Sequence, residues 1–365
     1  MKYLFDYARL PKDAKLLRDL NLAAQRLAQK LESFPVEESG LSEYCARVLL
    51  DKREVLTAYL QIYTYVLAWG LSRSDVDYSD LAVLEYGGGI GLISMLAKEL
   101  GVGAVVYNDI YEVSYRGAQQ LAGLIGLRAD HYVLGDIDNV IAYTERCDLS
   151  LDAIVSFDVI EHIYDIDAFL TRLASFKGQH LRIVMASGAN KYSRACSKRI
   201  MAFQRQCELR GREPTFGFYD RDALRPYMDI RREIIGRACA ALTDKEVETL
   251  AKRTRGLRED DIIRAVQGYR DQGLLPPELN HPTNTCDPYT GNWQEHLMEP
   301  SELVDVLSRA GFKADWSSGY FSGRYGSSLK CALAIAANAV IGLLDKRAIR
   351  LGKFYTLHGA RGGST

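Results

Sequence analysis

The stretch Val83-Leu84-Glu85-Tyr86-Gly87-Gly88-Gly89-Ile90-Gly91-Leu92 decides the fold of this 365-residue chain. The apolar residues up to Leu84 predict a short buried strand, which Glu85 closes. Three alternate glycines, Gly87, Gly89 and Gly91, then predict a tight turn, and residues 92–100 have the composition of a helix that ends at Gly101. Glycine leaves the backbone bare beside a ligand, and the start of the helix is expected to offer free N–H groups to it.

Two cofactor classes use such a turn. A dinucleotide fold requires the pattern G-x-G-x-x-G, and counting from Gly87 its last glycine would fall at Leu92. The pattern is instead acid-x-Gly-x-Gly-x-Gly, which resembles the first motif of the class I S-adenosylmethionine (SAM)-dependent methyltransferases. The resemblance implies SAM as cofactor.

Strand and helix patterns alternate after this turn. The predicted strands are residues 81–85, 104–108, 131–134, 152–157 and 181–186, which favours a parallel sheet with helices on both faces. Ligands of such sheets bind beyond the carboxyl ends of the strands, so the informative residues are expected directly after each strand.

Acidic residues follow the second and third predicted strands. Asp109 comes eighteen residues after Gly91, where a carboxylate is expected to accept hydrogen bonds from the two ribose hydroxyls. Asp136 is expected to bind the exocyclic amine of adenine. The alternatives are a helix-capping or solvated Asp for Asp109 and a turn residue for Asp136. The expected cofactor-binding set is Glu85, Tyr86, Gly87, Gly89, Gly91, Asp109, Ile110, Asp136, Ile137 and Asp158.

The segment Asp158-Val159-Ile160-Glu161-His162-Ile163 resembles one that many class I methyltransferases carry after the fourth strand. The resemblance places a carboxylate and an imidazole beside the methyl group of the cofactor. Because a hydroxyl acceptor must lose a proton, we predict His162 as general base, with Asp158 and Glu161 as orienting or cofactor-shell carboxylates.

Three alternatives stay open for these residues. His162 could cap or pack the next helix, or His281 or His296 could be the base. The acid-x-x-Glu-His spacing also resembles certain metal-dependent RNA methyltransferases, in which such side chains hold Mg²⁺ or Mn²⁺. No metal is assigned to the chain.

The resemblance resumes near the end of the chain. Residues 298–312 look like the helix that leads into the sixth strand of the family, and residues 354–357 look like its seventh, antiparallel edge strand. The implied fold class is α/β: a doubly wound, mostly parallel seven-stranded sheet (the Rossmann-like methyltransferase fold) with N-terminal helices and a helical insertion. The expected parts are an N-terminal helical segment (1–78), a SAM-binding core (79–187), an insertion or substrate lid (188–297) and the C-terminal part of the core (298–365).

Helical patterns dominate both additions to the core. In the N-terminal segment, Pro11 is expected to open a first helix and Ser42 to cap a longer one that ends near Gly70; a tyrosine of that helix is an alternative cover for the cofactor. The insertion is expected to hold helices at 191–210, 221–240 and 244–270, and residues 189–280 contain 19 Lys+Arg against 14 Asp+Glu. A solvated lid is the simpler interpretation, and a cap that prefers an anionic substrate is the alternative.

A loop dense in turn formers ends the insertion, at residues 281–296. Because loops often carry function, we expect substrate contacts there, with an ordered connector as the alternative. The candidate substrate residues are His281, Asn284, Trp293 and His296.

The composition describes a protein with net charge −1 and seven scattered cysteines that form no C-x-x-C pair. We expect a cytoplasmic protein without a secretory signal, structural zinc or nucleic-acid partner. The apolar run 331–344 is too short to span a bilayer and is expected to pack on the sheet or on a second subunit, so a homodimer is one option; contact with a membrane surface is the minority alternative.

Together these patterns favour a SAM-dependent methyltransferase whose acceptor is a hydroxyl of a small molecule or of a sugar or glycan. An NAD-binding oxidoreductase and a non-catalytic protein that retains the fold are the alternatives.

Overall fold

The computed structural model describes residues 3–73, 76–212, 223–279, 281–322 and 327–362. The chain divides into two compact units. The first comprises Met1–Val159, Asp167–Ser193 and Glu299–Thr365, and the second comprises Ile160–Ile166 and Arg194–Met298. The segment Ile160–Ile166, which the sequence analysis placed in the core, therefore belongs with the insertion.

The first unit holds the sheet and most of the helices. Its strands are β1 Ala82–Glu85, β2 Ala104–Asp109, β3 His131–Leu134, β4 Ala153–Phe157, β5 Arg182–Ser187, β6 Lys313–Ser318 and β7 Tyr355–Ala360. Its α-helices are α1 Ala14–Ser33, α2 Glu43–Glu54, α3 Leu56–Leu71, α4 Leu92–Leu100, α5 Glu112–Leu124, α6 Ile137–Arg146, α7 Ile166–Arg172, α12 Pro300–Arg309 and α13 Ser328–Leu344, with short 3₁₀ turns η1 Val36–Glu38, η2 Tyr78–Asp80, η4 Leu173–Ser175 and η5 Asp345–Ala348.

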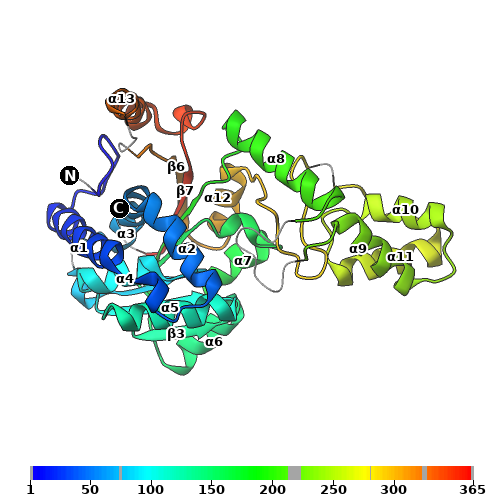
Figure 1. Ribbon diagram of the computed structural model, residues 1–365, viewed down its shortest axis with the longest axis horizontal. Coiled ribbons are helices and arrows are strands. Elements are labelled where there is room, and N and C mark those ends of the chain that lie inside the picture. Colours follow the sequence, from blue (N-terminus) through cyan, green and yellow to red (C-terminus); the bar gives the residue numbers. More distant parts are fainter. Residues whose placement is uncertain (1–2, 74–75, 213–222, 280, 323–326, 363–365) are drawn as a thin grey trace. The chain divides into compact units, whose positions relative to one another are not determined.

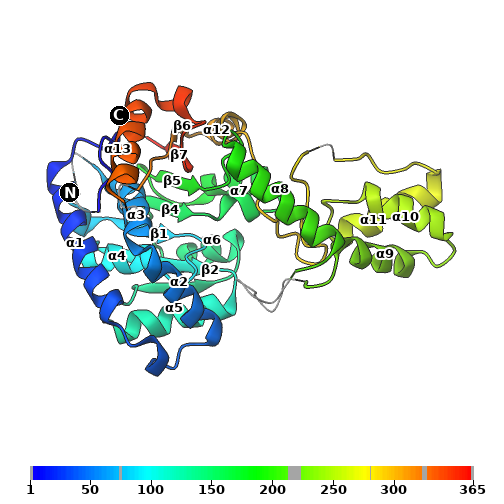
Figure 2. The same cartoon turned by 45° about the horizontal axis from the view of Figure 1, so that its top comes forward.

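The seven strands form one sheet in the order β3-β2-β1-β4-β5-β7-β6 (Figure 2). Strands β1 to β5 are parallel, and β7 runs antiparallel to both of its neighbours. The predicted α/β class and the antiparallel seventh strand are confirmed. The prediction that this strand lies at the edge is wrong, because β7 pairs with β5 on one side and with β6 on the other.

The N-terminal helices build a second layer over the sheet (Figure 1). Helix α1 packs on α3 and α4 through leucines at helical spacing, and α3 lies on β4 and β5. The N-cap of α1 is Asp13, whose side chain accepts a hydrogen bond from the Leu16 N–H, so the predicted start at Pro11 is wrong. Ser42 caps α2 as predicted, but the helix breaks at Val55, which has non-helical backbone angles.

The turn between β1 and α4 is shaped by packing as well as by backbone freedom. A Cβ atom on Gly87 would stand 2.7 Å from Val159 Cγ2, and one on Gly88 would stand 2.7 Å from Tyr107 Cε2. A Cβ atom on Gly89 would meet nothing within 4 Å, although the residue has a φ of +57°. Open space for a ligand is therefore found at Gly89.

The second unit is a helical unit with its own apolar core. It contains η3 Ile160–His162, α8 Arg194–Leu209, α9 Tyr227–Ala238, α10 Asp244–Arg253 and α11 Glu259–Gln272. The single helix predicted over 244–270 is two helices, because the chain turns near Gly256, which has a φ of +85°. Arg231 is fully buried in this unit and makes two hydrogen bonds to the Glu208 carboxylate.

Two of the three positive-φ glycines of the β1–α4 turn provide a matched test. Gly87→Ala and Gly89→Ala share a backbone penalty of roughly 1–2 kcal/mol. We expect Gly87→Ala to lower the free energy of unfolding by roughly 1–3 kcal/mol more, because its methyl group overlaps Val159. Urea denaturation of both variants measures the difference, and adding Val159→Ala should recover part of the loss in Gly87→Ala alone. Equal losses in the two glycine variants would contradict this account.

Candidate active site

Two buried carboxylates hold the glycine turn. Glu85 accepts hydrogen bonds from the N–H groups of Ile93 (3.2 Å) and Ser94 (2.8 Å) in the first turn of α4. Burial raises the pKa of Glu85 to about 7, against the hydrogen bonds that lower it. Since the side chain of Glu85 occupies these N–H groups, the expectation that the start of this helix offers them to a ligand is wrong in this respect.

Asp109 is buried, with 4% of its surface exposed, and faces the same turn. Its Oδ2 accepts a hydrogen bond from the Gly89 N–H (2.8 Å), and its Oδ1 accepts one from the Tyr111 N–H (2.8 Å). A carboxylate oxygen can accept more than one hydrogen bond. Tyr107 donates from its hydroxyl to the Gly89 carbonyl at 2.5 Å.

The loops after β2 and β3 contribute one capping acid and two isoleucines. Asp136 is the N-cap of α6, and its Oδ1 accepts from the N–H groups of Asp138 and Asn139, a helix-capping role that the sequence did not predict. Ile137 is buried in the first turn of that helix, whereas Ile110, directly after Asp109, is half exposed. An exposed apolar side chain at this point suits a flat aromatic ligand.

Tyr86 and Asp158 follow β1 and β4. The Tyr86 ring packs against Phe169 at 4.9 Å between centroids. Asp158 has a φ of +54°, an uncommon conformation for a residue other than glycine. Its Oδ1 accepts a hydrogen bond from the Gly188 N–H at 2.7 Å. This contact ties the carboxyl end of β4 to that of β5, so Asp158 has a defined position.

Lys52 of α2 is a site residue that the sequence analysis missed. Its ammonium lies 3.9 Å from the centre of the Tyr59 ring and donates a hydrogen bond to the Tyr63 hydroxyl at 3.1 Å. Both tyrosines pack edge-on against Phe157, the last residue of β4. Burial lowers the pKa of Lys52 to about 8, and the negative charges of Asp158 and Glu85 oppose that shift. No pattern marks Lys52, because it precedes the glycine turn by more than thirty residues.

His162 is oriented by the loop that ends the insertion. Its Nδ1 donates a hydrogen bond to the Trp293 carbonyl at 2.8 Å, and its own carbonyl accepts from the Trp293 N–H at 3.1 Å. Since a carbonyl can only accept, a neutral His162 carries its proton on Nδ1, and Nε2 is left as the basic nitrogen. This tautomer is the one that a general base requires.

The other two histidines of the insertion stack beside this contact. The His281 and His296 rings lie 4.2 Å apart, and Trp293 lies 4.6 Å from His296. Nδ1 of His296 donates to the Thr283 carbonyl at 2.6 Å, and burial followed by the charge of His281 lowers its pKa to about 4. His296 is therefore neutral near pH 7.

The remaining predicted residues of this unit are buried. Glu161 is 2% exposed, and its carbonyl accepts from the His296 N–H. Asn284 is 5% exposed and donates from its amide to the Leu279 carbonyl. Sequence positions 162, 281, 293 and 296 are thus brought together in one cluster, whereas Asp158 belongs to the first unit.

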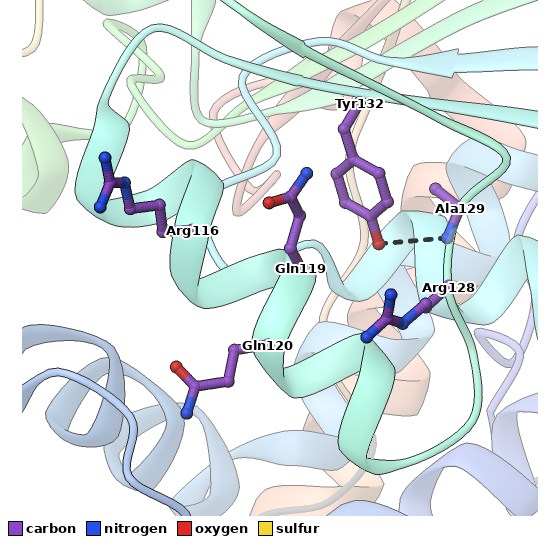
Figure 3. Close-up of a pocket in the computed structure, with 6 residues that line it drawn as sticks. All are labelled: Arg116, Gln119, Gln120, Arg128, Ala129 and Tyr132. Atoms are coloured by element: carbon purple, nitrogen blue, oxygen red, sulfur yellow. Dashed lines mark hydrogen bonds between the residues drawn. The ribbon is translucent and has the colours of Figure 1, made fainter.

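A metal centre finds no support in this geometry. Within the described ranges, no group of three or more His, Cys, Asp or Glu side chains is arranged to hold an ion. A cavity of about 450 Å³ near the amino end of β3 lies apart from the predicted residues (Figure 3). It is lined by Arg116, Gln119, Gln120, Arg128, Ala129 and Tyr132, and none of these residues belongs to the predicted site.

Comparison with known proteins gives structural matches alone. No family model and no curated protein matches the sequence. Solved structures match with a probability of 1.00. The plantazolicin methyltransferase BpumL in complex with SAH is 13% identical, with a TM-score of 0.39 over 95% of this chain and 98% of that one. Magnesium protoporphyrin IX methyltransferase (ChlM) from Synechocystis PCC 6803 with bound SAH is 14% identical, with a TM-score of 0.38 over 86% and 87%.

A third match is the complex between the Haloferax volcanii Trm112 methyltransferase activator and a putative methyltransferase, at 11% identity and a TM-score of 0.40 over 88% of this chain and 98% of that one. Values this low carry no argument about activity or acceptor. The strand order, the antiparallel β7 and the glycine turn closed by Glu85 and Asp109 themselves give this chain the fold of the class I SAM-dependent methyltransferases.

Proposed function

We propose that this protein is a SAM-dependent methyltransferase that transfers the methyl group to a hydroxyl of a small molecule or of a sugar or glycan. The observation that carries the proposal is that acidic side chains occupy the backbone N–H groups of the glycine turn and of the start of α4. Glu85 takes the N–H groups of Ile93 and Ser94, and Asp109 takes that of Gly89. A dianionic pyrophosphate would need such N–H groups and would face both carboxylates. A cationic sulfonium nucleoside suits the same surroundings, so the NAD alternative is disfavoured.

The residues of the first unit fit the parts of this cofactor. Asp109 would hold the ribose, and Asp136 the exocyclic amine of adenine, whose ring would lie on Ile110. The bare backbone at Gly89 would leave room for the amino-acid part. Lys52 supplies the positive charge that a carboxylate requires, and we assign it to the carboxylate of the methionine part.

When bound, SAM supplies a methyl group that is already activated by its sulfonium charge. The protein must then align the acceptor and receive its proton. His162 is the proposed base because Nε2 is its unprotonated nitrogen and the Trp293 carbonyl fixes the ring. A bound SAM would supply the electrophilic methyl group for the acceptor oxygen, and Nε2 of His162 would receive the proton of the acceptor hydroxyl.

The ribose contact is tested by Asp109→Ala and Asp109→Asn. We expect both variants to bind S-adenosylhomocysteine roughly tenfold to a hundredfold more weakly, because hydrogen bonds to a charged group are lost. Asp109→Asn keeps one oxygen for the turn, so it separates ribose binding from collapse of the loop. Isothermal titration measures the affinity, with Asp138→Ala on the adjacent helix as the matched control. Undiminished affinity in both Asp109 variants would refute the cofactor assignment.

The role of Lys52 predicts a pH dependence. Its pKa of about 8 means that the ammonium is present below that value and is lost as the pH rises through it. Wild type should therefore bind S-adenosylhomocysteine more tightly than Lys52→Met at pH 7, by roughly tenfold, and the ratio should shrink towards pH 9. Comparing the two proteins at each pH cancels titration of the ligand itself. Methylthioadenosine, which lacks the carboxylate, should bind both equally; a Lys52→Met effect on that ligand would contradict the assignment.

The role of His162 predicts a loss of turnover without a loss of cofactor affinity. We expect His162→Gln to slow formation of S-adenosylhomocysteine by roughly 10²–10⁴-fold in the presence of a mixture of hydroxylated metabolites and glycans. His180→Gln, an exposed histidine of the first unit, is the control. Full turnover in His162→Gln would assign the base elsewhere, and no turnover in the wild type with any acceptor would favour a non-catalytic protein.

A further inference from the structure

Helix α13 contacts the rest of the first unit through a narrow face that includes one buried polar residue. Asn338, in the second half of the helix, is buried and accepts from the Phe321 N–H (2.7 Å) while donating to the Phe321 carbonyl (2.8 Å). Arg9 donates to the Gly342 carbonyl at 2.7 Å. Ala334, Asn338 and Ile341 are the buried residues of this helix. The sequence predicted that this apolar run packs on the sheet or on a second subunit, but few of its residues are buried in the first unit.

Helix α13 lies on the outside of the first unit (Figures 1 and 2), and several of its apolar side chains are exposed. Leu329 is 71% exposed, Leu333 61% and Leu343 79%, and Val340 is exposed between them. With Ala336, these residues follow one another at alternating spacings of four and three positions. This spacing places all five on one face of the helix: Leu329, Leu333, Ala336, Val340 and Leu343. Leucines this exposed on a continuous stripe mark a surface that something covers.

Basic residues flank the stripe. Lys330 lies at the start of the helix, and Lys346, Arg347, Arg350 and Lys353 follow its end, all of them exposed. Asp345 is the one acidic residue within 327–353, and it is paired with Arg9. A chain of net charge −1 thus concentrates positive charge around its most exposed apolar helix.

The basic residues around α13 indicate which kind of partner covers its exposed apolar face. Antiparallel pairing with a second copy would bring Lys330 of one molecule towards Arg347 of the other, and parallel pairing would place like residues opposite each other, so both pairings are repulsive. An anionic lipid surface attracts both ends of the helix and accepts the leucines between them. The stretch Ser328–Ala348 is long and apolar enough to cross a bilayer by length and composition alone, contrary to the expectation for 331–344. A crossing would, however, break the contacts of Asn338 and Arg9.

We propose that α13 binds the surface of an anionic membrane, with Leu329, Leu333, Val340 and Leu343 at the level of the acyl chains and Lys330, Arg347 and Arg350 at the headgroup phosphates. The helix lies on the membrane and stays docked on the first unit. This inference is independent of the proposed methyltransferase activity, because it depends on contacts of α13 alone.

The test is co-sedimentation of the full chain with vesicles of phosphatidylcholine alone and of phosphatidylcholine with phosphatidylglycerol. We expect binding to the anionic vesicles, weaker binding at high salt, and little binding to the neutral vesicles. The Leu333→Ser/Leu343→Ser variant should bind at least roughly tenfold more weakly, since two exposed leucines leave the lipid. Leu124→Ser, on the exposed side of α5, is the matched control and should bind as the wild type does.

A second pair of variants tests the charges. Arg347→Gln/Arg350→Gln should bind anionic vesicles more weakly and with a smaller salt dependence, whereas Arg116→Gln on α5 should not. Circular dichroism confirms that the variants are folded. Unchanged binding of the leucine variant, or no binding of the wild type to either vesicle, would overturn the proposal. So would a wild-type dimer in light scattering that the leucine variant dissociates, because a second copy would then cover the helix.

Discussion

The hydrogen bond from the Gly89 N–H to Asp109 is the contact on which the site depends. It joins the turn after β1 to the carboxyl end of β2, and Glu85 fixes the other half of the turn through Ser94. Two carboxylates in a buried turn are costly unless hydrogen bonds compensate them, and backbone N–H groups provide that compensation here. The turn is therefore held in an open form by its own strands, which reduces the ordering that a bound ligand must impose.

Local patterns predicted most of the core. The five parallel strands were placed to within a residue or so, because apolar runs and the residues that end them are adjacent in the sequence. Long-range pairing was harder. The place of β7 between β5 and β6 depends on partners that no local pattern specifies. The reason for glycine was also only partly predicted, since Gly87 and Gly88 avoid Val159 and Tyr107 rather than a ligand.

In the candidate site, too, local patterns predicted some residues and missed what depends on long-range contacts. Asp109 and Asp158 were predicted because each follows a strand, and their contacts hold loops together in the structure. Lys52 was missed because its partners Tyr59 and Tyr63 lie on the next helix and carry no motif. The proposed roles of His281, Trp293 and His296 rested on the composition of their loop. Their stacking depends on the folded path of this loop, and the Trp293 carbonyl that orients His162 requires a fold that joins positions more than a hundred residues apart.

The charged residues near the glycine turn and those around the C-terminal helix form two separate groups, and each group suits a different kind of ligand. Glu85 and Asp109 accept hydrogen bonds from the backbone of the glycine turn and of α4, and burial lowers the pKa of Lys52 to about 8. The C-terminal helix buries Ala334, Asn338 and Ile341 and leaves leucines exposed between basic ends. A net charge of −1 conceals both arrangements, because it sums 46 basic and 47 acidic residues over the whole chain. Electrostatic complementarity acts over roughly a Debye length, so the local pattern is what a sulfonium nucleoside or an anionic lipid surface would encounter.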